Sequence, residues 1–112
     1  MSDATETVQS KIGIVPMDNI VVVDRKHPLA KEFWTPRNGY KPDAAMVNSI
    51  RANGGPDYAP KVWPWKDAEG KQWLIVIDGN QRVIASREAG LDKLKVDVQV
   101  GMSQQDASRL AT

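Results

Sequence analysis

A β-branched, apolar run at residues 72–77 leads into Asp78-Gly79, and a helical pattern starts at once at Asn80 and stops at Gly90. The run has the composition of a strand, and the pattern after it has a glycine at each boundary, as expected of a short helix. The sequence therefore predicts an α/β domain with a strand-to-helix turn at Asp78-Gly79-Asn80-Gln81-Arg82.

Length and composition restrict what surrounds this turn. A chain of 112 residues is large enough for one hydrophobic core and too small for two. Fifteen Lys and Arg against fourteen Asp and Glu give a net charge of +1, so any anion binding must be local. The lack of cysteine excludes disulfides, thiolate nucleophiles and cysteine-based zinc sites. No apolar stretch approaches the roughly 20 residues that span a bilayer, so we expect a cytoplasmic protein with no membrane partner.

Further elements follow from periodicity and from the positions of Pro and Gly. We expect a flexible N-terminus over residues 1–11, a domain over residues 12–112, and a long irregular connection at residues 24–42. Strands are predicted at residues 12–16, 20–23, 61–65, 72–77 and 94–100, and helices at residues 43–53, 80–89 and 103–110. Strands 61–65 and 72–77 form a β-hairpin, in which Pro64 requires an edge position or pairing through the other side of its strand.

The turn itself has the features of an anion site. A helix N-terminus presents backbone N–H groups at the positive end of the helix dipole. Gly79 allows close approach of the backbone, Asn80 can cap the helix, and Arg82 can donate two hydrogen bonds to a phosphate. Asp78 and Glu88 are carboxylates that could hold a metal ion or accept a proton. The alternative is that these residues only cap a helix and interact with water.

The other conspicuous side chains have simpler interpretations. Trp63 and Trp65 share one face of their strand, where packing with Trp73 across the hairpin is expected. Trp34 lies in the irregular connection and is a candidate for a lid or a partner contact. His27 is the only histidine, and we assign it no catalytic role.

The order of these features resembles the N-terminal domain of the ParB/sulfiredoxin-like superfamily over residues 14–110. The family opens its helix with Gly-Glu-Arg-Arg, and this chain has Gly79-Asn80-Gln81-Arg82, so the glycine and the last arginine match. Thr35-Pro36-Arg37 is similar to the Pro-Arg motif of the family, which makes Arg37 a second candidate cation.

The resemblance implies an α/β (α+β) fold, a small mixed sheet flanked by helices, truncated at its C-terminal helix. It also implies binding of a nucleoside triphosphate, CTP or ATP with Mg²⁺, or of a nucleic-acid phosphate. The implied binding residues are Arg37, Gly79, Asn80, Gln81 and Arg82. The sulfiredoxin reaction is excluded because its cysteine is absent.

Three functions remain open. The first is a nucleotide-binding module associated with DNA partition or regulation, with DNA bound through a separate domain or partner, and with a homodimer as one oligomeric form. The second is a phosphotransferase or nuclease that uses Asp78 or Glu88 as catalytic groups. The third is an inactive adaptor from a phage or mobile element that binds another protein.

Overall fold

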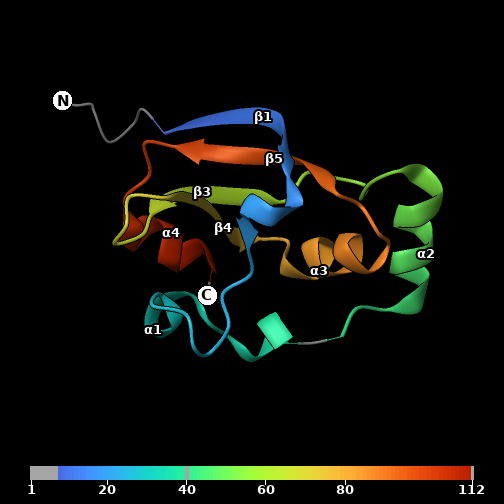
Figure 1. Ribbon diagram of the computed structural model, residues 1–112, viewed down its shortest axis with the longest axis horizontal. Coiled ribbons are helices and arrows are strands. Elements are labelled where there is room, and N and C mark those ends of the chain that lie inside the picture. The colour runs from blue at the N-terminus through green and yellow to red at the C-terminus, as the bar shows by residue number, and fades with distance from the viewer. Residues whose placement is uncertain (1–7, 40, 112) are drawn as a thin grey trace.

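The computed structural model describes residues 8–39 and 41–111, and within them the chain forms a five-stranded mixed sheet with four α-helices (Figure 1). The strands are β1 (Gln9–Pro16), β2 (Ile20–Val21), β3 (Lys61–Lys66), β4 (Gln72–Asp78) and β5 (Lys93–Val100), in the spatial order β1-β5-β3-β4-β2. Antiparallel pairs join β1 to β5 and β3 to β4, and parallel pairs join β3 to β5 and β2 to β4. The predicted α/β class is confirmed.

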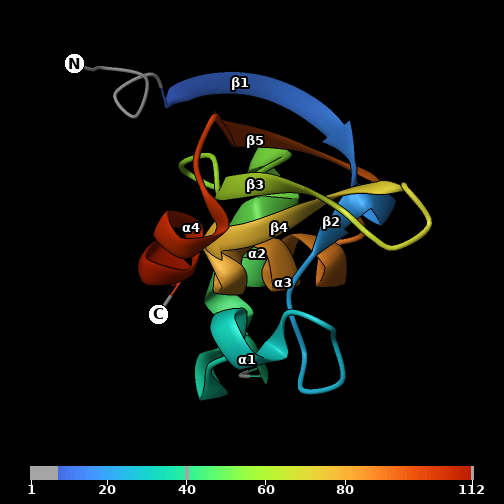
Figure 2. The same ribbon diagram turned by 90° about the vertical axis from the view of Figure 1, so that its left-hand side faces the viewer.

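The helices form two groups. They are α1 (Ala30–Phe33), α2 (Ala44–Asn53), α3 (Asn80–Glu88) and α4 (Gln104–Ala111), with 3₁₀ turns η2 (Met17–Asn19) and η3 (Pro36–Gly39). Helices α1 and α4 lie near one end of the domain, and α2 and α3 lie near the other (Figure 1). A view turned by 90° shows α3 following β4 directly (Figure 2).

The core lies on both faces of β4, as the alternation of its side chains requires. Leu74 and Val76 pack on one face with Val83 of α3. Ile75 and Ile77 pack on the other face, in a cluster that also contains Phe33 of α1 and Ala107 of α4. Since both faces are covered, β4 is apolar at successive positions, and the turn after it is held by buried residues on both sides.

Helix α2 confirms the helix predicted at residues 43–53, and a capping residue defines each of its ends. Asp43 is the N-cap, and its carboxylate accepts a hydrogen bond of 2.9 Å from the N–H of Ala45. Gly54 ends the helix in the left-handed conformation, with a φ of 77°. Val47 and Ile50 are buried where α2 meets Ala85 of α3.

The hairpin and its tryptophan packing are also confirmed. Trp65 pairs with Trp73 across β3 and β4, and Trp63 stacks on Phe33 with ring centroids 5.7 Å apart. The pairing of β3 with β5 covers only Lys61 and Val62. Although β3 is an inner strand, Pro64 lies on the part of it that pairs with β4 alone. The missing N–H of Pro64 therefore interrupts no hydrogen bonds between β3 and β5.

Two expectations about order along the chain were wrong. Strand β1 begins at Gln9, so the last residues of the N-terminal segment that we expected to be flexible belong to the sheet; residues 1–7 lie outside the described residues. The connection at residues 24–42 contains α1 and η3. These turns are too short to produce a periodic pattern, and tertiary contacts of Phe33 fix the first of them.

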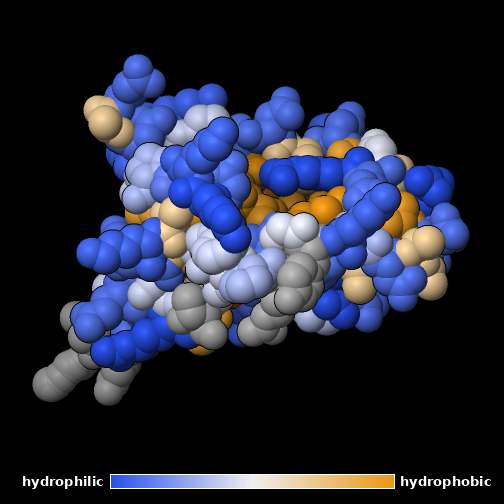
Figure 3. All heavy atoms as spheres, turned by 90° about the horizontal axis from the view of Figure 1, so that it is seen from below, coloured by the Kyte–Doolittle hydropathy of each residue, from blue (hydrophilic) through white to orange (hydrophobic). Residues whose placement is uncertain are grey.

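Among the described helices, none has the length and apolar character needed to cross a bilayer. Seen from below, the surface is largely hydrophilic, with apolar residues exposed in a hollow near its middle (Figure 3).

Candidate functional site

The turn between β4 and α3 depends on a glycine in a conformation that other residues avoid. Gly79 has a φ of 100° and is the N-cap of α3. A Cβ atom built at this position would lie 3.1 Å from Cβ and 3.3 Å from Cα of Pro60. Pro60 is itself fixed, because it is buried and its carbonyl accepts a hydrogen bond of 2.8 Å from the N–H of Asp97. Both the backbone and the available space therefore require glycine.

This geometry directs the start of α3 toward a cavity. The first hydrogen bond within α3 runs from the N–H of Val83 to the carbonyl of Gly79, at 3.1 Å. The backbone N–H groups of the helical residues before Val83 therefore have no acceptor within the helix. The positive end of the helix dipole lies at the same place and favours a negative group. The cavity has a volume of about 200 Å³ and is lined by Thr35, Tyr58, Ile77, Asp78, Gly79, Asn80, Gln81, Arg82, Leu110 and Ala111.

Arg82 is held at the cavity wall by two neighbours from the loop after α2. Its Nε donates to Oδ1 of Asp57 at 2.9 Å, and its guanidinium lies 3.8 Å from the centroid of the Tyr58 ring. The hydrogen bond from Arg82 lowers the pKa of Asp57, whose side chain is 77% exposed. Asp57 and Tyr58 could not be identified from the sequence, because they lie in a Gly- and Pro-rich turn, which carries no periodic pattern.

Asn80 does not cap the helix, contrary to expectation. Gly79 takes that position without a side-chain bond, and Nδ2 of Asn80 instead donates to Oδ1 of Asn38 at 3.2 Å. Asn38 is buried, and its Nδ2 donates to the carbonyls of Val23 and Phe33 at 2.8 and 3.1 Å. Asn80 thus ties η3 to the start of α3. Within the described residues, the buried Oδ1 of Asn80 has no hydrogen-bond partner.

For the predicted second cation, Arg37, the structure describes only the position of the backbone. This backbone lies close to the turn, because the adjacent Asn38 is hydrogen-bonded to Asn80. Arg37 lies in η3, next to Asn38, and its side chain lies outside the described part of the structure. The importance of Asn38 was also missed, because Asn38-Gly39 is equally typical of a simple turn.

The two candidate catalytic carboxylates are not brought together. Asp78 is exposed at the end of β4 and lines the cavity. Glu88 is exposed at the last position of α3, roughly 12 Å further along the helix axis at 1.5 Å per residue. It lines a different cavity, together with Lys41 and Arg87. The described residues contain no group of three His, Cys, Asp or Glu that could hold a metal ion.

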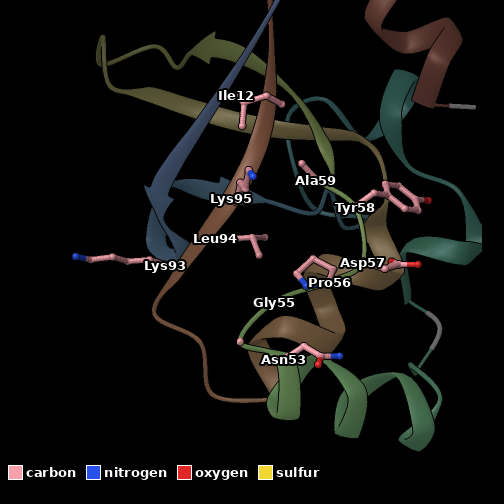
Figure 4. Close-up of a pocket in the computed structure, with 11 residues that line it drawn as sticks. Ile12, Asn53, Gly55, Pro56, Asp57, Tyr58, Ala59, Lys93, Leu94 and Lys95 are labelled. Carbon is pink, nitrogen blue, oxygen red and sulfur yellow. The ribbon is translucent and has the colours of Figure 1, made fainter.

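A larger cavity lies beside the first and shares Tyr58 with it. It has a volume of about 560 Å³ and is bounded by the loop after α2 and the start of β5 (Figure 4). The side chains of Asp57 and Tyr58 extend to one side of this region, whereas Lys93 extends to the opposite side (Figure 4). Tyr58 therefore separates a small polar cavity from a larger one.

Comparison with known proteins adds no assignment to this geometry. No protein-family model matches the chain, and searches of curated proteins and of solved structures give no match either. A functional conclusion must therefore come from the site itself.

Proposed function

We propose that the cavity at the start of α3 binds a phosphate group of a nucleoside triphosphate, CTP or ATP, or of a nucleic acid. We further propose that the chain is a ParB/sulfiredoxin-like domain that acts in DNA partition or regulation. The observation that supports the proposal is the Gly79 turn, which brings the N-terminus of a nine-residue helix and Arg82 to one cavity.

The size of the cavity determines which part of a nucleotide it can enclose. Ligand pockets that bury a whole drug-sized molecule have volumes of about 300–1,000 Å³. At about 200 Å³, this cavity suits the phosphates alone. The nucleoside would extend past Tyr58 toward the larger cavity, where the aromatic ring offers a surface for stacking a base.

The ion pair of Arg82 is compatible with phosphate binding, because Asp57 is a replaceable partner. The Asp57 carboxylate is largely exposed and can return to water at little cost. A phosphate carries more charge and accepts two parallel hydrogen bonds from a guanidinium. We therefore expect a bound phosphate to take the place of Asp57 beside Arg82.

Mg²⁺ fits the site only as an ion that arrives with a polyphosphate. Asp78 is the one carboxylate among the described residues that line the cavity. Mg²⁺ in nucleotide sites is commonly held by one or two carboxylates together with the phosphates of the substrate. Asp78 would be the protein ligand, and the ion would neutralise the charge on the phosphates.

Calorimetric titration with CTP, ATP, GTP and UTP in the presence of Mg²⁺ tests the proposal. We expect one nucleotide to bind, and Arg82→Ala to weaken it by roughly 10- to 100-fold, the value of a charge-assisted hydrogen bond. Asp57→Asn removes the competing charge and should leave affinity equal or higher. Arg51→Ala, on α2, is the matched control for loss of one arginine and should bind like the wild type.

The Arg82→Ala protein must first be shown to be folded, because Arg82 also contacts Tyr58. Thermal unfolding followed by circular dichroism provides this check, and Arg82→Lys retains a positive charge if the alanine variant unfolds. Lack of binding to all four nucleotides by a folded wild-type protein would contradict the proposal.

One observation favours the adaptor as a second candidate. Strand β1 lies at the edge of the sheet, and Ile12 and Ile14 on it are 57% and 71% exposed. Exposed apolar residues on an edge strand are typical of sites that pair with another chain. If the folded protein binds none of the four nucleotides in the titration, this candidate is favoured.

A further inference from the structure

A fourth cavity, chemically different from the one at Gly79, lies at the other end of the β3–β4 hairpin. It has a volume of about 270 Å³ and is lined by Val21, His27, Pro28, Trp65, Asp67 and Trp73. None of these residues lines the cavity at Gly79. Trp73 and Asp78 are five positions apart on β4, so about 17 Å of extended strand separates the two cavities.

Three aromatic rings and one carboxylate form the characteristic part of this cavity. The rings of His27 and Trp65 are 5.3 Å apart between centroids and inclined at 56°, so they form two walls at an angle. Trp73 lies opposite Trp65 on the neighbouring strand. Lys71 places its Nζ 4.1 Å from the centroid of the Trp73 ring, so this ring already attracts an ammonium group of the chain itself.

The cavity has a negative charge that is fixed in position. Oδ1 of Asp67 accepts hydrogen bonds from the N–H groups of Glu69 and Lys71 at 2.9 and 3.0 Å, and Oδ2 accepts one from Nε1 of Trp73 at 2.9 Å. The bond from Trp73 is the main cause of a lowered pKa of Asp67, so the carboxylate is ionised at neutral pH.

His27 contributes an uncharged wall at the same pH. Its Nδ1 accepts a hydrogen bond of 3.0 Å from the N–H of Leu29, which places the proton of the neutral ring on Nε2. Burial lowers the pKa of His27, although the charge of Asp24 partly opposes this effect. The side chains that line the cavity thus carry one negative charge at neutral pH. The Lys71 ammonium does not line the cavity, but it lies over the Trp73 ring and helps to lower the pKa of Asp67.

We infer that this cavity binds a methylated ammonium group of the trimethylammonium class, with methyl groups against the two tryptophan rings and the charge balanced by Asp67. Aromatic faces attract such cations because the charge is spread over apolar methyl groups that lose little hydration. A primary amine or an inorganic cation keeps its water more strongly and fits less well. The group has two sources, a free small molecule such as choline or a trimethylated lysine side chain.

The test uses the full chain and the indole N–H signals of its four tryptophans in ¹H–¹⁵N NMR spectra. Addition of choline should shift the signals of Trp65 and Trp73 in a saturable way and leave that of Trp34 in place. The neutral isostere 3,3-dimethylbutan-1-ol should bind roughly tenfold more weakly, as the loss of a partly desolvated cation–π contact implies. Equal binding of the two compounds, or no shift with choline, would overturn the inference.

Matched variants connect the binding to the residues. Trp65→Leu should weaken choline binding at least tenfold, whereas Trp34→Leu, which changes a tryptophan outside the cavity lining, should leave it unaltered. Asp67→Asn keeps an oxygen acceptor for the hairpin turn but removes the charge, so it should also weaken binding and remains decisive if Trp65→Leu unfolds. Unchanged affinity in folded Asp67→Asn would refute the role of the carboxylate.

A binding experiment with a peptide distinguishes the two sources of the ammonium group. A short peptide with one trimethyl-lysine that binds more tightly than choline would assign the cavity to a modified protein. Tighter binding of choline than of the peptide would assign it to a small molecule. Neither result depends on the nucleotide titration, since the two cavities have no lining residue in common.

Discussion

At Gly79 the chain meets two separate restrictions, a positive φ and close contact with Pro60. Gly79→Ala should therefore lower the free energy of unfolding by about 2–5 kcal/mol, the sum of a left-handed backbone cost and an overpacking cost. Urea unfolding measures this loss. Gly70→Ala is the matched control, because Gly70 has a φ of 84° with no atom within 4 Å of the added Cβ. It should cost only about 1–2 kcal/mol; equal losses would show that contact with Pro60 is unimportant.

His27 gives the folded chain a pH dependence whose direction follows from its environment. Burial lowers the pKa of the folded-state ring below the ordinary value of 6.5, so the unfolded chain takes up its proton first as pH falls. The stability that the neutral ring contributes is therefore fully present above the ordinary pKa of 6.5, which applies to the unfolded chain. It is lost as the pH falls toward the lower pKa of the folded state. Protonation of Nδ1 also removes the acceptor for the N–H of Leu29.

Urea unfolding at pH 7.5 and pH 5.5 tests this direction. The wild type should lose more stability between the two pH values than His27→Gln, which lacks the titrating ring. An identical loss in both proteins would mean that His27 has the same pKa in the folded and unfolded states.

At the scale of elements, α2 shows how one polar side chain sets a helix boundary. Asp43→Ala removes the acceptor of the Ala45 N–H and should cost about 1 kcal/mol of stability. Asp43→Asn keeps an oxygen in the same place and should cost much less. Thermal unfolding of the two variants under the same conditions provides the comparison, and a full loss in the asparagine variant would argue for charge rather than for capping.

The elements that could be predicted from sequence are those defined by local chemistry. Helix α2 was recognisable from Asp43 and Gly54, and α4 from Ser103, whose Oγ accepts a bond of 3.1 Å from the N–H of Asp106. The hairpin was recognisable from its β-branched and aromatic residues. Helix α1 and turn η3 were missed because short turns are fixed by contacts with distant residues, such as those of Phe33 with the sheet.

The candidate site divides in the same way. Gly79 and Arg82 could be identified because a strand, a glycine and a helix follow one another in sequence. The partners Asp57, Tyr58 and Asn38 could not, because each reaches the turn from a distant segment. Asp78 and Glu88 lie at opposite ends of α3, because a helix of nine residues separates its two ends in space.

For the whole molecule, the relevant feature is the exposed sheet edge formed by β1. Residues of β1 pair only with β5 in the described structure, which leaves the outer edge of an eight-residue strand available. We expect weak, concentration-dependent self-association through this edge. The double variant Ile12→Lys/Ile14→Lys should reduce it in sedimentation velocity experiments, whereas Leu110→Lys, at a residue of α4 that is 53% exposed, should not. Equal effects would exclude β1.

The walls of the cavity at Gly79 come from the connection before η3, the loop after α2, the β4–α3 turn and α4. During synthesis on the ribosome, three of these walls leave the exit tunnel before α4 does. A ligand that needs the complete cavity can then bind only after α4 has docked. Its binding would stabilise the assembled domain by mass action, and resistance to a protease would rise over the whole described chain at once.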